Sequence, residues 1–276
     1  ARCCFFTEQT SEALPPRRSS RCSVILLTDH CLLFTALYAT SRYLSISQSI
    51  FDLYPDAMLG LVFVEGADNR GEMGGFAEQQ KAVERSVRER FPTTEDVGKD
   101  PFIQAWRRAY RAFGCDPHDY RCSSEALTRQ VVKGNDIWGI NPLVDCYNFI
   151  SLKYVLTAGG EDADKIVGDI ELRRATGTEP FVRLGGTENE PPEVGEVIYA
   201  DAEGVLCRRW NWREADRTKL TADTTRAVLV VETVAPMTRE TLEAATAELA
   251  QLVETWCGAQ TKTVILDQQN PVVDFS

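Results

Sequence analysis

The densest group of side chains suited to ligand binding is the string Arg-Arg-Trp-Asn-Trp-Arg at residues 208–213. With Arg217 and Lys219 it brings five basic residues and two tryptophans into twelve positions. Guanidinium groups grip phosphate or carboxylate oxygens in pairs, and indole faces stack on bases or clamp apolar groups. In a strand, alternate residues share a face, so both tryptophans would lie together. We predict ligand contact here; the alternative is an edge strand with a buried tryptophan and cation–π contacts.

A second polar group follows one face of a helix that we expect to begin after Asn141, which can cap it, with Pro142 in its first turn. Asp145, Asn148 and Ser151 form a stripe of short side chains on this helix. Such residues are poor helix formers and are typical of places where they make fixed hydrogen bonds. The stripe therefore predicts a pocket wall, and a solvated helix surface is the alternative.

Two glycines and two carboxylates come directly after this helix, at Gly159, Gly160, Glu161 and Asp162. Glycine permits positive φ angles and lets a ligand approach the backbone closely. We therefore expect a turn that presents both acids beside accessible backbone.

The chain has 276 residues, of which 43% are hydrophobic and 26% charged, which is typical of a globular protein with a sizeable core. Its net charge is −11, and residues 51–276 carry 38 acidic against 25 basic side chains. This balance excludes nucleic-acid binding by bulk charge, so an RNA partner needs a local basic patch. Residues 107–133, with six basic and three acidic side chains, are a candidate, and ordinary charged helix surfaces are the alternative. We expect no DNA partner and no membrane span.

The remaining pattern predicts the elements that hold these groups in place. Apolar runs predict strands at 59–64, 165–173, 181–184, 196–199, 205–207, 227–232 and 263–266. Helical spacing predicts helices at 76–91, 102–113, 123–133, 142–154 and 238–257. Several strands follow one another too closely for intervening helices. We therefore predict an α+β (mixed α/β) fold with mixed sheets packed against helices. No nucleotide-binding glycine motif and no known hydrolase motif is present.

Residues 1–46 differ from the rest of the chain. They lack Lys and show no periodicity outside an apolar run at 24–39, which is too short and too polar to span a bilayer. We expect a poorly ordered extension, vestigial or wrongly included, and an organellar transit peptide is the alternative. The folded domain is placed at 47–276.

The nine cysteines show no disulfide-like spacing. We interpret the five after residue 50 as reduced core thiols of a cytoplasmic protein. Cys115, His118 and Cys122 come nearest to a metal motif but lack a paired C-x-x-C, so we predict no metal site.

Several ordered motifs resemble a known family. The runs 140–148, 151–154, 159–162 and 168–170 look like the B3/B4 domain of the phenylalanyl-tRNA synthetase β subunit. Ser-Glu-Ala-Leu at 124–127 and Arg-Trp-Asn-Trp-Arg at 209–213 make the chain more similar to freestanding B3/B4 proteins, over roughly residues 50–260. It departs from the synthetase pattern at Gly159, where that pattern has histidine, and at 207–213, which replace a glycine-rich segment. The departures imply a different amino acid or a changed activity.

The resemblance implies an editing site that hydrolyses the ester of a mischarged amino acid on the 3′ end of tRNA. We therefore expect an aminoacyl-tRNA deacylase that acts in trans, without ATP, cofactor or obligatory metal. Because such an ester is already activated, a positioned water, donors for the oxyanion and a side-chain pocket suffice. The alternatives are a non-catalytic module that binds tRNA or an aminoacyl ligand, and a hydrolase of small amino-acid derivatives.

This hypothesis gives each candidate residue a role. Gly159 and Gly160 would donate backbone N–H groups to the oxyanion, and Glu161 or Asp162 would orient water or hold the α-amino group. Substrate contacts are expected from Asn141, Asp145, Asn148, Ser151, Tyr154, Trp210 and Trp212, with the tryptophans on the terminal adenine. RNA contacts are expected from Arg208, Arg209, Arg213, Arg121 and Lys219. These roles require the helix stripe and the tryptophan segment to close over one cavity.

Overall fold

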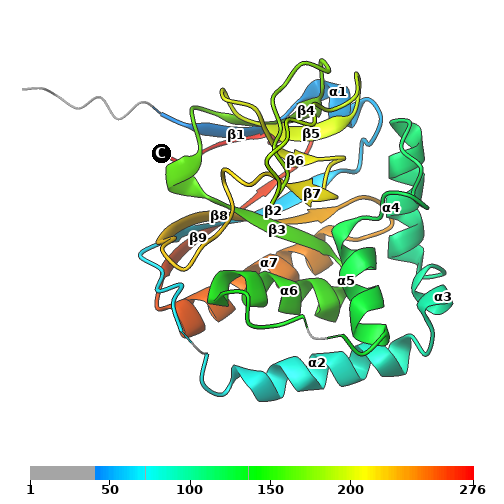
Figure 1. The fold of residues 1–276 in the computed structure, drawn as a ribbon, viewed down its shortest axis with the longest axis vertical. Helices are drawn as coiled ribbons and strands as arrows, with labels where there is room; N and C mark the ends of the chain where they lie inside the picture. Colours follow the sequence, from blue (N-terminus) through cyan, green and yellow to red (C-terminus); the bar gives the residue numbers. More distant parts are fainter. Residues whose placement is uncertain (1–40, 72, 136) are drawn as a thin grey trace, which may run out of the picture. The chain divides into compact units, whose positions relative to one another are not determined.

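The computed structural model describes residues 41–71, 73–135 and 137–276. In this part of the chain, a six-stranded sheet packs against a four-stranded sheet, and helices cover the outer face of the smaller one (Figure 1). The strand orders are β10-β1-β4-β5-β6-β7 and β3-β8-β2-β9. The predicted α+β fold of mixed sheets packed against helices is confirmed.

The six-stranded sheet is formed by β1 (Tyr43–Ile46), β4 (Ile170–Arg174), β5 (Val197–Ala200), β6 (Val205–Arg208), β7 (Arg213–Glu214) and β10 (Val272–Asp274). Strands β1 and β4 are parallel, and the other neighbours are antiparallel. Tyr199 lies opposite Cys207, and Cys207 lies opposite Glu214. Because opposed residues share a face, these three side chains form one row.

The four-stranded sheet is formed by β2 (Met58–Glu65), β3 (Thr157–Asp162), β8 (Arg226–Thr233) and β9 (Gln260–Leu266), each antiparallel to its neighbours. Strand β3 is an edge strand. Its Gly159 lies opposite Val230, and its Glu161 lies opposite Val228. The two-residue period of a strand then places Glu232 on the same face as these four residues.

The α-helices are α1 (Gln48–Phe51), α2 (Phe76–Arg90), α3 (Thr94–Val97), α4 (Pro101–Ala112), α5 (Ser123–Val132), α6 (Pro142–Tyr154) and α7 (Arg239–Cys257), and residues Ala163–Lys165 form a 3₁₀ turn. Asn141 caps α6 by accepting a hydrogen bond from the Val144 N–H at 3.1 Å. Helices α6 and α7 pack beneath the four-stranded sheet (Figure 1). The approach of α7 is so close that a side chain at Gly60 would collide with Thr246.

The predicted long helices are confirmed, as are the strands at 59–64, 196–199, 205–207, 227–232 and 263–266. Four expectations were wrong. Residues 159–162 form strand β3 instead of a turn; strand β4 begins only at Ile170; residues 181–184 make two isolated bridges but no strand; and residues 208–213 turn a corner.

The predicted domain boundary at residue 47 falls one residue after β1, which pairs with β4 and β10 and so belongs to the folded domain. Residues 1–40 of the predicted extension lie outside the described residues. The five later cysteines are free and buried, as predicted. No helix among the described residues has the length and apolarity needed to cross a membrane.

Candidate functional site

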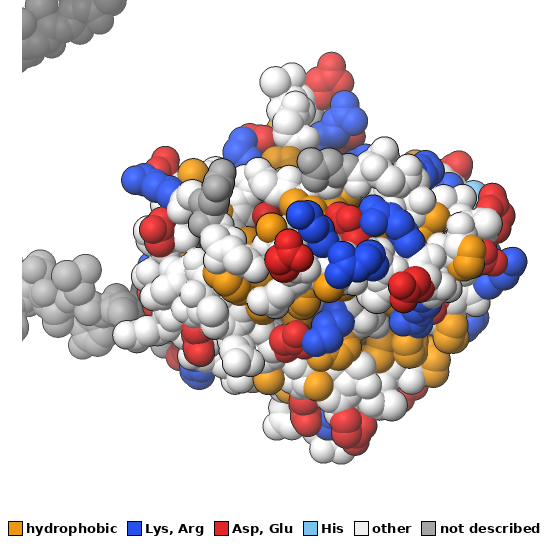
Figure 2. Space-filling view, turned by 90° about the horizontal axis from the view of Figure 1, so that it is seen from below, with side chains coloured by type: hydrophobic (Ala, Val, Ile, Leu, Met, Phe, Trp, Pro, Cys, Tyr) orange, Lys and Arg blue, Asp and Glu red, His pale blue; other side chains and the backbone are white. Residues whose placement is uncertain are grey.

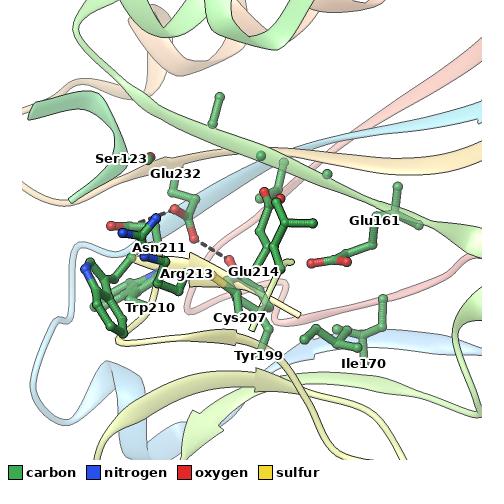
Figure 3. Close-up of a pocket in the computed structure, with 18 of the residues that line it drawn as sticks. Ser123, Glu161, Ile170, Tyr199, Cys207, Trp210, Asn211, Arg213, Glu214 and Glu232 are labelled. Atoms are coloured by element: carbon green, nitrogen blue, oxygen red, sulfur yellow. Dashed lines mark hydrogen bonds between the residues drawn. The ribbon is translucent and has the colours of Figure 1, made fainter. Parts of the chain in front are cut away.

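A cavity of about 410 Å³ lies between the two sheets (Figure 3). Strands β3 and β8 line one side, strands β1, β4, β5, β6 and β7 line the other, and Ser123 of α5 and residues 183–185 complete the wall. This volume is within the range of small-molecule sites. Part of the wall is apolar: Leu44, Ile170, Leu206, Val228 and Val230.

Two carboxylates, Glu161 and Glu214, face this cavity from opposite sheets. The Glu214 Oε1 atom lies only 3.2 Å from where a Cβ on Gly159 would stand, so the missing side chain makes room for it. Glu161 is two residues further along the same face of β3. Among the described residues, no Lys or Arg nitrogen lies within 4.0 Å of either carboxylate.

The low-dielectric surroundings of this pair change how it holds protons. Burial and the neighbouring Glu214 carboxylate raise the pKa of Glu161 well above its ordinary value. Burial also raises the pKa of Glu214 to about 7, against a backbone hydrogen bond from Gly160 that lowers it. The nearby Thr218 hydroxyl and the more distant charge of Arg217 lower the pKa of Glu161, but less than burial and Glu214 raise it. Two like charges in a buried site do not both ionise readily, so the pair retains a proton near neutral pH.

A third carboxylate, Glu232 of β8, closes the cavity through a buried hydrogen-bond network. The Tyr199 hydroxyl donates to Glu232 Oε1 at 2.6 Å, and the Asn211 amide donates to Oε2 at 2.8 Å. The Tyr110 hydroxyl in turn donates to Asn211 Oδ1 at 2.9 Å. This network ties α4, the β6–β7 turn, β8 and β5 together at the cavity wall, and Figure 3 shows its members Tyr199, Asn211 and Glu232.

Glu232 makes stability depend on pH in a predictable direction. Burial raises its pKa from 4.5 to about 7, and the hydrogen bonds from Tyr199 and Asn211 act in the opposite direction. Between these values the folded chain binds a proton that the unfolded chain lacks, so stability falls as pH rises through that window. The free energy of unfolding of the wild type should therefore fall by roughly 3 kcal/mol between pH 5 and 7. Glu232→Gln should remove most of this fall.

Urea unfolding of the wild type and of Glu232→Gln at several pH values checks this expectation. Glu171→Gln is the control, because Glu171 on β4 is a partly exposed carboxyl outside the cavity. Parallel profiles for the wild type and Glu232→Gln would contradict the assignment.

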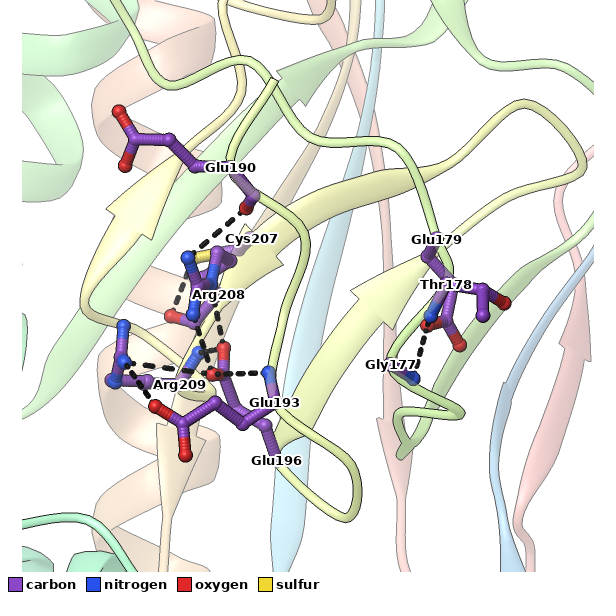
Figure 4. A network of polar contacts seen from close by, with 9 residues as sticks. All are labelled: Gly177, Thr178, Glu179, Glu190, Glu193, Glu196, Cys207, Arg208 and Arg209. Atoms are coloured by element: carbon purple, nitrogen blue, oxygen red, sulfur yellow. Dashed lines mark hydrogen bonds and ion pairs between the residues drawn. The ribbon is translucent and has the colours of Figure 1, made fainter. Parts of the chain in front are cut away.

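The turn between β6 and β7 is held in an unusual backbone conformation. Arg209 and Trp210 have φ angles of 48° and 67°, in the left-handed region that non-glycine residues rarely adopt. The Glu196 carboxylate fixes the turn by accepting hydrogen bonds from the Arg208 guanidinium at 2.8 and 2.9 Å and from the Arg209 N–H at 3.0 Å (Figure 4). Backbone of this kind persists only where the surroundings determine it strongly, and such places are common at functional sites.

Trp210, which is part of this corner, anchors the turn in the core. Trp210 has 0% exposure and packs edge-on against Tyr54 and Trp106, with ring centroids 5.0 Å apart in both pairs. The turn therefore directs the next four residues, 211–214, to the cavity wall.

Six of the predicted site residues line the cavity together: Gly159, Gly160, Glu161, Trp210, Trp212 and Arg213. Their segments are far apart in the sequence and belong to two different sheets. The packing of these sheets brings the segments to one cavity. The glycine pair therefore lines the same cavity as the tryptophan segment, even though it belongs to a strand and not to the turn that we expected.

The polar stripe of α6 lies outside the cavity, because the four-stranded sheet stands between them. Asn141 caps the helix; Asp145 accepts from the Gly139 N–H at 2.9 Å; Ser151 donates to the Leu156 carbonyl at 2.6 Å; and Tyr154 donates to Glu248 at 2.7 Å. Asn148 is half-buried on the same helix. The expectation that this stripe and the tryptophan segment close over one cavity is therefore wrong. Asp145 and Ser151 do make fixed hydrogen bonds, but to nearby backbone groups and not to a ligand cavity.

The remaining predicted residues are also held elsewhere. Asp162 is buried and accepts from the Thr224 hydroxyl at 2.7 Å. Arg208 and Arg209 are buried beside Glu196. Their side chains are therefore not exposed for the RNA contacts that we expected of them. Lys219 pairs with Asp216 at 2.8 Å, and Arg121 is exposed with Glu125 at 3.6 Å.

The surface is mixed in charge. On the face shown in Figure 2, Lys and Arg side chains gather near the centre, with Asp and Glu side chains around them and hydrophobic side chains alongside. This face does not present a broad basic surface of the kind that binds nucleic acid by charge alone.

Sequence reasoning missed several cavity residues, namely Tyr199, Cys207, Glu214 and Glu232, and it gave Asn211 no role of its own within the predicted ligand-contact segment. One signal was available, because Glu232 is a carboxylate at the end of an otherwise apolar strand. Cys207 is not an activated nucleophile: burial, with Glu214 and Glu161 nearby, raises the pKa of its thiol well above the ordinary value. Within the described ranges, no group of three or more His, Cys, Asp and Glu side chains is arranged to hold a metal ion.

Comparison with known proteins gives three findings. The B3/4 domain matches residues 105–258 of this chain. The phenylalanine–tRNA ligase beta subunit of Mycoplasma genitalium is 36% identical over 67 residues, which cover 24% of this chain and only 8% of that subunit. An N-terminal fragment of the phenylalanyl-tRNA synthetase beta subunit from Pyrococcus horikoshii aligns with a TM-score of 0.42 and 14% identity, covering 80% of this chain and 53% of that one.

The B3/4 match covers more than half of the chain. It includes strands β3 to β8 and helix α5, and therefore most of the cavity wall described above. The chain belongs to the B3/4 domain family.

Proposed function

We propose that this protein is an aminoacyl-tRNA deacylase that acts in trans on the ester of a mischarged amino acid. The observation that carries the proposal is the Glu161–Glu214 pair, which faces a cavity of about 410 Å³ beside the side-chain-free backbone of Gly159. Membership of the B3/4 family and the match to a tRNA ligase subunit support the choice of an aminoacyl ester. The proposed partner is the charged 3′ end of tRNA.

The carboxylate pair supplies what this hydrolysis needs. In its singly protonated form, the ionised carboxylate accepts a proton from water as the water oxygen attacks the ester carbonyl carbon. The bond from that carbon to the ribose oxygen then breaks, and the ribose oxygen takes up the proton held by the other carboxyl of the pair. The products are a free amino acid and a tRNA with a 3′-terminal hydroxyl. The apolar wall, including Ile170 and Val230, is suited to the amino-acid side chain.

A panel of misacylated tRNAs tests the proposal directly. Recombinant protein is incubated with each charged tRNA, and loss of the ester is followed against a reaction without protein. We expect at least one misacylated tRNA to be deacylated and the correctly charged cognates to be spared. If no tRNA in the panel loses its ester faster than the blank, the enzyme hypothesis fails.

The rate should also depend on pH in a stated direction. Because the pKa of Glu214 is raised to about 7, protonation removes the ionised carboxylate as pH falls below that value. We expect kcat, corrected for spontaneous hydrolysis, to rise between pH 6 and 8, and Glu214→Gln to remove most of this dependence. A wild-type profile that is flat across that range would contradict the role of the pair.

A second candidate function is a non-catalytic module that binds an aminoacyl ligand. The cavity and its partly apolar wall favour it, since such a wall can hold an aminoacyl group whether or not hydrolysis follows. Binding of charged tRNA that leaves the ester intact would distinguish this module from a deacylase.

A further inference from the structure

We propose that a groove beside helix α4, called here the α4 groove, binds a free α-amino acid with an apolar side chain. The groove has a volume of about 250 Å³. Its walls are the turn at 53–57 that follows α1, one face of α4, and residues 234 and 235 after β8. It shares no lining residue with the cavity between the two sheets, so it is a separate site.

The wall of the α4 groove is largely apolar and is held in place by packing. Ala57, Ala105 and Ala109 line it with buried methyl groups, and Leu53 adds an exposed apolar side chain. The Tyr54 hydroxyl donates to the Ala109 carbonyl at 2.8 Å, which fastens the turn to α4. The volume is below the range of about 300–1,000 Å³ that is typical of drug-sized ligands, so the groove suits a small molecule.

Two side chains of opposite charge line the same groove, Asp56 from the turn and Arg108 from α4. Both are exposed, and among the described residues neither side chain has an ion pair or a hydrogen bond. Arg107, the preceding residue on α4, differs in this respect, because Glu125 binds its guanidinium at 2.5 and 2.9 Å. The charges of Asp56 and Arg108 are therefore available to a ligand.

The arrangement of these groups matches a zwitterion. A guanidinium group binds a carboxylate through two parallel hydrogen bonds, and a carboxylate accepts hydrogen bonds from an ammonium group. A free α-amino acid carries one carboxylate, one ammonium group and one side chain on a single carbon. Arg108, Asp56 and the alanine wall are the complements of these three groups. An anion would meet repulsion from Asp56, and a cation would meet repulsion from Arg108, so complementarity favours a ligand that carries both charges.

The α4 groove is connected to the cavity wall through aromatic packing. Tyr54 lines the groove, and its ring packs against Trp210, which lines the cavity, with ring centroids 5.0 Å apart. A ligand in the groove therefore contacts a residue that supports the cavity wall. The binding does not depend on the proposed function, although the proposed hydrolysis releases a molecule of this class.

Isothermal titration calorimetry with the full chain tests the α4 groove. L-Valine, L-leucine and L-methionine are the probes, together with the deaminated and the decarboxylated form of each. We expect at least one of the three amino acids to bind with a Kd of about 1 mM or lower. Its deaminated and decarboxylated forms should each bind roughly tenfold more weakly, because each lacks one of the two charges.

Three variants assign this binding to the groove. Arg108→Gln and Asp56→Asn should each weaken it about tenfold, since each removes one charged partner. Ala112→Leu places a larger side chain in the groove from an exposed position on α4, so it should reduce binding at least as much without disturbing the core.

The matched controls are Arg111→Gln on α4 and Asp52→Asn at the end of α1, which remove the same charges outside the groove. Both should bind the amino acid like the wild type, and so should Glu161→Gln in the cavity. The inference is overturned if none of the three amino acids binds, or if the controls lose as much affinity as the groove variants.

Loss of binding in Glu161→Gln alone would assign the amino acid to the cavity and would also overturn the inference. Binding that requires Arg108 and Asp56, without deacylation of any ester, would retain the α4 groove and remove the proposed function. Deacylation without such binding would do the reverse.

Discussion

Glu161→Gln is expected to lower kcat for deacylation by at least about a hundredfold while leaving the fold intact. A positioned acid–base group typically contributes a factor of 10² to 10⁴. Glutamine preserves the size of the side chain but cannot release the proton that the Glu161 carboxyl, whose pKa is raised well above its ordinary value, gives to the ribose oxygen. Because the Glu161 carboxylate has no basic partner within 4.0 Å among the described residues, its loss leaves no buried cation unpaired. Single-turnover deacylation of the best substrate from the tRNA panel measures the effect.

The control for this prediction is Glu171→Gln on β4, which changes the same functional group next to the cavity-lining Ile170. It should deacylate at the wild-type rate. The circular dichroism spectra and urea midpoints of both variants verify folding. Full activity of Glu161→Gln would show that Glu161 has no part in the chemistry.

Trp210→Ala is expected to reduce the unfolding free energy by about 3–5 kcal/mol, the usual cost of removing a large aromatic side chain from a core. The indole has 0% exposure and contacts two aromatic rings, so its removal leaves a void between α4 and the β6–β7 turn. The left-handed φ of 67° remains unfavourable for alanine, and with the ring gone less packing opposes that strain.

Urea unfolding of Trp210→Ala and Trp212→Ala provides the comparison. Trp212 is only half-buried and has one described ring contact, with Tyr120, so its removal should cost about 1 kcal/mol. If both variants lose the same free energy, Trp210 does not anchor the turn.

The sequence predicted the elements whose signals are local. Helix α6 begins where Asn141 and Pro142 indicate, and α7 lies between Thr238 and Gly258, because caps depend on neighbours within one turn. Strand β3 was missed for the opposite reason. Its two glycines are typical of a turn, and only pairing with the distant β8 makes the segment a strand.

The candidate site could be predicted in part, since the polar residues of the chain are used in two different ways. Asp145 and Ser151 form hydrogen bonds with backbone groups a few residues away. The type of a residue alone does not show whether its side chain will bond to the backbone or to a ligand. Glu214 enters the cavity only because the chain reverses at Arg209 and Trp210, against the preference of both residue types. A continuous strand would have been the expected conformation there, so the cavity wall followed from tertiary structure.

The β6–β7 turn combines an anchor in the core with part of the cavity wall. Trp210 is packed in the interior, and Glu214, four residues later, faces the cavity. Selection for a new substrate is therefore expected to spare this turn and to accumulate its changes on β8 and β4, at positions such as Val230 and Ile170, where wall shape can vary without loosening the hairpin.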